Sequence, residues 1–217
     1  MSKEKFEREG QSNETAKAFR IARSVPELAR EIKKEGVEAV VYEARAFRHR
    51  EVLIKHRVLL DRILTTCLGE LIGQKGTDSY SFNHVVVTAR NLITKEPTLS
   101  FGDVNKLHVA VEAVIADMQE ILLPFRTFKI RHTSVKQADN FAAVRNQDWH
   151  IDSGAGALHI VRVYSGPSTE YTLGGDKQKQ PFKDGAISVH TEYAIHRAPY
   201  YGEDKPRFAI VMRLIYA

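Results

Sequence analysis

The sequence predicts an α+β fold in which helices come first and β-strands follow. Up to about residue 125 the apolar residues recur mainly at helical spacing, and beyond Pro124 they alternate with polar residues as they do in strands. Glycines then punctuate the chain at turn-like intervals, and no repeat or low-complexity linker divides it. We therefore expect a flexible arm over 1–24 and a single domain over 25–217, with helical support over 25–125 and a β-barrel or sandwich over 126–217.

The first half carries signals for several helices. Start and stop residues predict a helix over 24–35, and a short strand over 37–42 follows it. Apolar periodicity predicts a long helix from about 44 to 72 and an amphipathic helix over 104–123. The stretch 79–93 stays open, because its β-branched run favours a strand while the residues after it continue a helical pattern.

The second half carries strand signals. Alternation and β-branched residues predict strands over 128–135, 141–145, 158–164, 184–190 and 207–216.

Composition places few limits on function. The chain has 43% hydrophobic and 27% charged residues, as soluble globular proteins do. The net charge of +5 comes from basic and acidic residues that are mixed along the chain, which favours a solvated surface over a nucleic-acid footprint. The single cysteine, Cys67, excludes an internal disulfide and is expected to be a buried thiol. With neither a signal core nor an apolar span of about 20 residues, we expect a cytoplasmic protein.

The residues that point to chemistry lie in the last third. His150 and Asp152 stand two positions apart, so on an extended segment both side chains leave the same face and can bind one ion. His196 supplies a third ligand, and two imidazoles with one carboxylate suit Fe(II) while leaving coordination positions open. Two alternatives remain. His150 and Asp152 could be an ordinary strand-end histidine and turn aspartate, and His190 could replace His196 as the second histidine.

Arg207 opens the last predicted strand, 11 residues after His196. Its forked, permanently charged guanidinium suits a carboxylate end group, so we predict that it binds a dicarboxylate cosubstrate. Arg213 lies on the same face of that strand, about 20 Å farther along at roughly 3.3 Å per residue, and is a candidate for the other end of a bound cosubstrate. Arg162 shares a face with Tyr164 and is a candidate for an acidic cosubstrate or substrate group, with a buried structural pairing as the alternative.

The ordered pattern of His150-x-Asp152, His196 and Arg207 resembles that of the Fe(II)/2-oxoglutarate-dependent dioxygenases, in their prolyl-hydroxylase-like branch. The resemblance covers roughly residues 126–217. It implies a double-stranded β-helix (jelly roll) packed against the N-terminal helices, and a tyrosine at Tyr164 that helps to bind the far carboxylate of 2-oxoglutarate. Ala209 departs from the family, which often has a hydroxyl or amide side chain there.

A second likeness involves the stretch from Tyr164 through Gly166-Pro167 to Thr169-Glu170. It is similar to an uncharacterised bacterial domain family with a His-x-Asp, Tyr-x-Gly-Pro-x-Thr-Glu pattern, and it names no substrate.

The resemblance implies an oxygenase that uses Fe(II), 2-oxoglutarate and O2 to hydroxylate a C–H bond, releasing succinate and CO2. We expect a small-molecule or amino-acid-like substrate and no membrane partner, and leave the oligomeric state open. The alternatives are a non-catalytic jelly-roll protein that binds metal or ligand, a cupin-like metal enzyme of other chemistry, and a nucleic-acid dealkylating oxygenase. Arg207 argues against the cupin-like enzyme.

Overall fold

The computed structural model describes residues 19–75, 79–138, 149–152, 156–172, 185–198 and 206–217. Its helices are α2 (Val25–Glu31), α3 (Arg50–Lys55), α4 (Arg57–Gly69), α5 (Ser79–Thr94), α6 (Phe101–Leu122) and the 3-10 turn η1 (Leu123–Phe125). Its strands are β1 (Phe19–Ala22), β2 (Ala39–Tyr42), β3 (Phe128–Ala138), β4 (Ala157–Ser165), β5 (Glu170–Tyr171), β6 (Ile187–Thr191), β7 (His196–Arg197) and β8 (Arg207–Tyr216).

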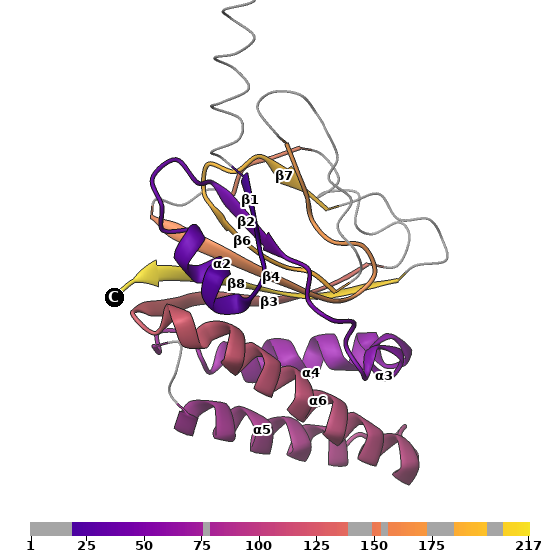
Figure 1. Ribbon diagram of the computed structural model, residues 1–217. Coiled ribbons are helices and arrows are strands. Elements are labelled where there is room, and N and C mark those ends of the chain that lie inside the picture. The colour runs from indigo at the N-terminus through magenta and orange to yellow at the C-terminus, as the bar shows by residue number, and fades with distance from the viewer. Residues whose placement is uncertain (1–18, 76–78, 139–148, 153–155, 173–184, 199–205) are drawn as a thin grey trace, which may run out of the picture.

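The described elements form layers around one large sheet. Six strands hydrogen-bond in the order β1-β2-β6-β4-β8-β3, and all neighbours are antiparallel except β1 and β2. Helices α4 and α6 lie beneath this sheet with α5 below them, and the two-stranded β5–β7 sheet lies on the opposite side (Figure 1). The fold is therefore a mixed α+β architecture with a β-sheet core and a helical layer, as the sequence predicts at this level.

The alternation of β8 separates the two faces of the large sheet. Its even-numbered apolar residues, such as Phe208 and Met212, belong to the main core shared with the helices. Its odd-numbered residues face the β5–β7 side, where Ala209 packs with Val161 and Val163 of β4. Both faces are buried over most of the strand. One face thus provides the core, and the other provides the floor of a polar cavity.

Two helix predictions need correction. The stretch predicted as one helix over about 44–72 starts only at Arg50 and is broken at His56, whose ψ of 22° interrupts the helical backbone. The ambiguous stretch 79–93 is helix α5. It buries Phe82, Val85 and Ala89 on one face, so packing against the helical layer overrides the strand preference of its β-branched residues.

The predicted arm also ends earlier than expected. Phe19–Ala22, within the predicted arm, form β1 and pair in parallel with β2. The rest of the arm and the predicted strand 141–145 lie outside the described residues. The helix predicted over 24–35 is confirmed as α2, with the Ser24 hydroxyl accepting a hydrogen bond from Glu27 N, although it ends at Glu31. Among the described helices, none is both long enough and apolar enough to cross a membrane.

Candidate metal centre

The backbone brings His150 and His196 side by side. His150 N donates to His196 O at 3.0 Å, and His196 N donates to His150 O at 2.9 Å, which forms an isolated antiparallel bridge. Residues paired in this way project their side chains to the same side, and the two imidazole rings lie 4.5 Å apart. On the other edge of β7, Tyr171 of β5 stands directly opposite His196 in the antiparallel β5–β7 pair.

Asp152 completes a group of three donors. Its Oδ2 lies 3.5 Å from His196 Nε2, and its Oδ1 lies 4.0 Å from His150 Nε2. One ligand atom from each of the three residues lies within 4.8 Å of the others. Since metal–ligand bonds of about 2.0–2.2 Å put neighbouring ligand atoms roughly 3–4 Å apart, small movements suffice for all three to bind one ion.

The state of these donors fits a divalent metal. His196 Nδ1 lies 3.0 Å from the Ala194 carbonyl, which can only accept, so Nδ1 carries the proton and the lone pair is on Nε2. Burial, with a smaller contribution from nearby His190, lowers the pKa of His196 to about 3, so the imidazole is neutral at neutral pH. Hydrogen bonds from His159 and then His190 hold the pKa of Asp152 well below its ordinary value against the effect of burial.

Two further histidines contact Asp152: His190, which the sequence offered only as an alternative to His196, and His159, which was not predicted as a site residue. His159 Nδ1 lies 2.9 Å from Asp152 Oδ2, and His190 Nε2 lies 3.3 Å from the same oxygen. They form, with Asp152, a second group of three potential metal ligands. The Tyr171 hydroxyl lies 3.0 Å from His190 Nδ1. Period 2 puts His159 on the same face of β4 as Val161 and Val163, but nothing in the sequence indicated that this face held the site.

Arg207 lies at the start of β8 and is buried. Its Nη2 donates to the Thr169 hydroxyl at 3.2 Å, and its Nε has no hydrogen-bond partner in the described part of the chain. No carboxylate among the described residues forms an ion pair with it. A buried guanidinium without a counter-ion is costly, so this position suits an anionic ligand.

Gly166 explains how Arg207 reaches this position. Its φ is +79°, and a Cβ there would stand 2.9 Å from Arg207 Cα and 3.0 Å from Pro206 O. Only glycine permits both the turn after β4 and this close approach of β8. The Gly166-Pro167 turn noted in the sequence therefore has a structural role beside the predicted cosubstrate site.

The three donors and Arg207 share one cavity of about 200 Å³. Its lining consists of Lys136, His150, Asp152, Val161, Thr169, His190, His196, Ala198, Arg207 and Val211. Lys136, on β3, contributes a second cation that was not predicted as a site residue. The cavity thus combines potential metal ligands, two cationic side chains and an apolar floor.

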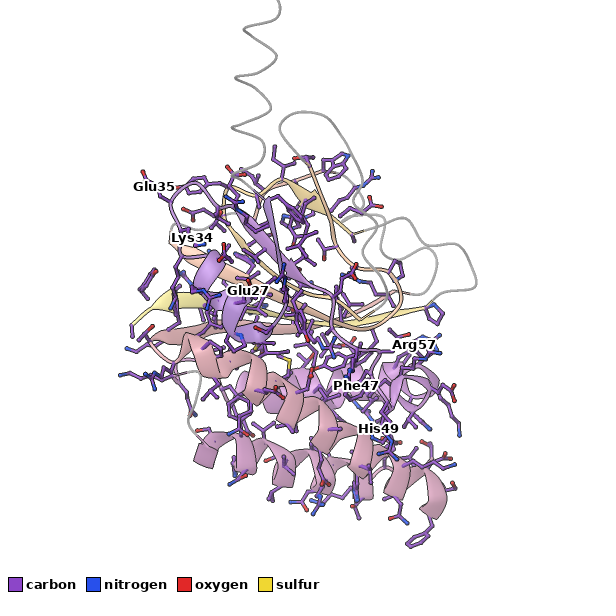
Figure 2. The ribbon with its side chains drawn as sticks, in the orientation of Figure 1. Glu27, Lys34, Glu35, Phe47, His49 and Arg57 are labelled. Carbon is purple, nitrogen blue, oxygen red and sulfur yellow. The ribbon has the colours of Figure 1, made fainter. Side chains whose placement is uncertain are left out.

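Two predicted cosubstrate residues lie on the opposite face of the sheet. Arg162 is buried against α6, where its Nε donates to Asp117 Oδ2 at 2.8 Å, and it lines a separate cavity of about 690 Å³. Tyr164 is 1% exposed, and its hydroxyl donates to the Val114 carbonyl at 3.4 Å. Its ring meets Phe47, labelled in Figure 2, edge to face at 4.8 Å. Neither side chain lines the 200 Å³ cavity. The ion pair with Asp117 supports the buried structural pairing of Arg162.

Arg213 faces the β5–β7 side but does not line the 200 Å³ cavity. It stands opposite His159 of β4 and His132 of β3 in the sheet register. The structure therefore offers it no role beside Arg207.

Arg197 makes a second contact between the two segments that carry His150 and His196. Arg197, next to His196, forms an ion pair with Glu170 at 2.7 Å, and its guanidinium lies 4.5 Å from the centre of the Trp149 ring. Because Trp149 precedes His150, this contact links the two histidine-bearing segments a second time.

The solved structures that resemble this chain include several at low identity. No family model and no curated protein matches the sequence. One of these structures is the Kdo hydroxylase KdoO, a non-heme Fe(II) alphaketoglutarate dependent dioxygenase, in complex with succinate and Fe(III). Its sequence is 13% identical to this one and its TM-score is 0.41, over 91% of this chain and 88% of that chain. The nickel complex of the non-heme monooxygenase ThoJ is 13% identical with a TM-score of 0.36, over 79% of this chain and 71% of that chain. A protein from E. coli (strain K12) is 16% identical with a TM-score of 0.34, over 42% of this chain and 95% of that chain. Likenesses this distant carry no function over to this chain, whose own side chains are the guide to it.

Proposed function

We propose that this protein is an Fe(II)- and 2-oxoglutarate-dependent oxygenase that hydroxylates a C–H bond of a small molecule and releases succinate and CO2. The observation that carries the proposal is the shared cavity, in which a two-histidine, one-carboxylate group faces a buried arginine that has no carboxylate partner in the described residues. In this proposal the six-stranded sheet and the β5–β7 pair are the two sheets of a double-stranded β-helix.

His150, Asp152 and His196 would hold the metal. Two neutral imidazoles and one ionised carboxylate are the ligand set that non-heme Fe(II) oxygenases use. When bound, the iron would supply the redox chemistry that couples decarboxylation of 2-oxoglutarate to oxidation of the substrate. The chain's own contribution is to present these donors in an arrangement fixed by the His150–His196 backbone bridge.

Arg207 would bind the far carboxylate of 2-oxoglutarate. Its two Nη groups and Nε form a fork that matches a carboxylate, and Thr169 already accepts from Nη2 and so fixes the plane of that fork. Lys136 adds a second positive charge at the same cavity. The dicarboxylate thus has a cationic anchor at one end and the metal-binding residues at the other.

The cavity walls would control water and orientation. Val161 and Val211 give the cavity an apolar part of its wall, which suits the two methylene groups of 2-oxoglutarate. A cavity of about 200 Å³ suits a small dicarboxylic acid.

The experiment is measurement of succinate formed by purified protein with Fe(II), ascorbate, 2-oxoglutarate and O2. We expect succinate release above background in the wild type, even without the true substrate, and none in His150→Ala or Asp152→Ala. Candidate small acids and amino acids are then tested for stimulation of turnover. If the wild type binds Fe(II) and 2-oxoglutarate but none of these conditions yields succinate, the non-catalytic binding protein replaces the oxygenase.

A further inference from the structure

We propose that His159 and His190 are positioning residues that hold Asp152 in one orientation, with Oδ2 bound to the protein and Oδ1 presented to the metal. The proposal rests on the proposed function in that His150, Asp152 and His196 are taken as the metal ligands. It adds two histidines and a tyrosine to the site and assigns each oxygen of Asp152 a separate task.

The hydrogen bonds around His190 define its protonation. Asp152 Oδ2 lies 3.3 Å from His190 Nε2, and a carboxylate accepts only, so Nε2 carries the proton. The other nitrogen, Nδ1, then has the lone pair and accepts from the Tyr171 hydroxyl at 3.0 Å. Both His190 and Tyr171 are 1% exposed, so water does not compete for these bonds. Tyr171 thereby keeps the His190 N–H aimed at Asp152.

His159 supplies a second donor to the same oxygen. Its Nδ1 lies 2.9 Å from Asp152 Oδ2, and its side chain is 7% exposed. In the sheet register His159 of β4 stands directly opposite His190 of β6, and the two rings stack with centres 5.2 Å apart. Two neighbouring strands of the rigid sheet thus place two N–H groups on one carboxylate oxygen.

The consequence concerns how Asp152 binds a metal. With Oδ2 accepting from two buried imidazoles, Oδ1 is the oxygen left for the ion, and it lies on the His150 side at 4.0 Å from Nε2. Asp152 would therefore bind an ion through Oδ1 alone, and a coordination position that a bidentate carboxylate would fill would stay open. Partners of this kind commonly contribute 10–100-fold to metal affinity.

A competing reading makes the same residues a second metal site, since Asp152, His159 and His190 also lie within ligand distance of one another. Both histidines are almost completely buried, whereas the side chains of His150 and Asp152 are 34% and 31% exposed to the cavity. Entry of an ion between His159 and His190 would also require both N–H bonds to Asp152 to be given up. Hydrogen bonds account for both nitrogens of His190 and for His159 Nδ1 without a second ion, and only His159 Nε2 is left without a partner in the described residues.

The test is anaerobic Co(II) titration by calorimetry and visible absorption, with the variants His159→Leu, His190→Leu and Tyr171→Phe. The matched rescue variants are His159→Asn, whose amide nitrogen can replace Nδ1, and His190→Gln, whose amide nitrogen can replace Nε2. His132→Leu, at an exposed histidine of β3, is the control for loss of an imidazole, and His150→Ala is the control for loss of a ligand.

We expect the wild type to bind one Co(II) per chain. The dissociation constant should be 10–100-fold larger in the two Leu variants and should rise less in Tyr171→Phe. The Asn and Gln variants should recover most of the wild-type affinity. His132→Leu should match the wild type. Wild-type affinity in both Leu variants overturns the proposal. If circular dichroism shows that a Leu variant is not folded, wild-type affinity in Tyr171→Phe overturns it instead. Two Co(II) per wild-type chain falling to one in His159→Leu overturns it in favour of a second metal site. If His150→Ala instead binds Co(II) like the wild type, the proposed triad itself is wrong, which is a different outcome.

Discussion

Gly166 stands so close to Arg207 that a Cβ at position 166 would lie 2.9 Å from the arginine Cα. This close approach ties the turn after β4 to the first residue of β8, and through it to the cavity that also contains His150, Asp152 and His196. The backbone at Gly166 therefore helps to set the distance between the two halves of the candidate site.

The first prediction concerns this glycine. Gly166→Ala is expected to displace Arg207 and to raise the KM for 2-oxoglutarate, with a strain cost of about 1–3 kcal/mol to folding. Gly156→Ala is the matched control, because Gly156 also has a positive φ of +71° but nothing lies within 4 Å of its added Cβ. Both variants are compared by thermal unfolding and by 2-oxoglutarate kinetics. An equal KM in the two would show that the close approach does not position Arg207.

The second prediction separates the two arginines of β8. Arg207→Met removes a buried charged donor from the cavity, so 2-oxoglutarate binding should weaken by about 2–5 kcal/mol, or at least about 30-fold. Arg207→Lys should recover only part of this, since an ammonium cannot form the forked pair. Arg213→Met, on the same strand but outside the cavity lining, should leave the affinity near the wild-type value. Isothermal titration with the metal-loaded protein measures all three, and equal losses at both positions would rule out Arg207 as the specific anchor.

The third prediction tests the structural assignment of Arg162. Asp117→Ala leaves the buried guanidinium of Arg162 without its ion-pair partner at 2.8 Å and should destabilise the fold by roughly 3–5 kcal/mol. Metal and 2-oxoglutarate affinities of the folded variant should not change, because Arg162 faces α6. Denaturant unfolding and ligand titration provide the two readouts. A large change in 2-oxoglutarate affinity with little loss of stability would restore Arg162 as a cosubstrate residue.

Arg162 and Tyr164 also show where sequence reasoning reached its limit. Period 2 correctly placed these two residues on one face of β4 and separated Arg207 from Phe208 on β8. It did not indicate which face held the site, because nearly all residues of β4 are buried and neither face has a polar, exposed pattern. The choice depended on which side the helices cover, which is a property of the tertiary structure.

The candidate triad, in contrast, was accessible from the sequence. A two-residue spacing determines that His150 and Asp152 project together wherever the backbone is extended, and an ordered histidine and arginine downstream completed the pattern. His159 was not assigned to the site, because a lone histidine on an apolar strand is usually structural, and His190 was considered only as an alternative to His196. Only the strand register, which pairs them directly, reveals that both contact Asp152.

The fourth prediction concerns pH and the metal-free protein. Burial lowers the pKa of His196 from 6.5 to about 3 and also lowers that of His190. Between about pH 6.5 and pH 3 the unfolded chain therefore binds more protons than the folded chain. The free energy of unfolding should therefore fall as pH is lowered through this window, by up to roughly 1.4 kcal/mol per pH unit for His196, and His190 should act in the same direction. Denaturant unfolding of EDTA-treated protein across the window measures this slope. His196→Gln should flatten it, and a slope that is the same in this variant would contradict the assignment to His196.

The most direct test of the account is a crystal structure of the protein grown anaerobically with Mn(II) and 2-oxoglutarate, with the metal located from its anomalous scattering. We predict one anomalous peak within bonding distance of His150 Nε2, Asp152 Oδ1 and His196 Nε2, with the far carboxylate of 2-oxoglutarate on the guanidinium of Arg207. A peak between His159 and His190, or an ordered metal with 2-oxoglutarate bound away from Arg207, would contradict it.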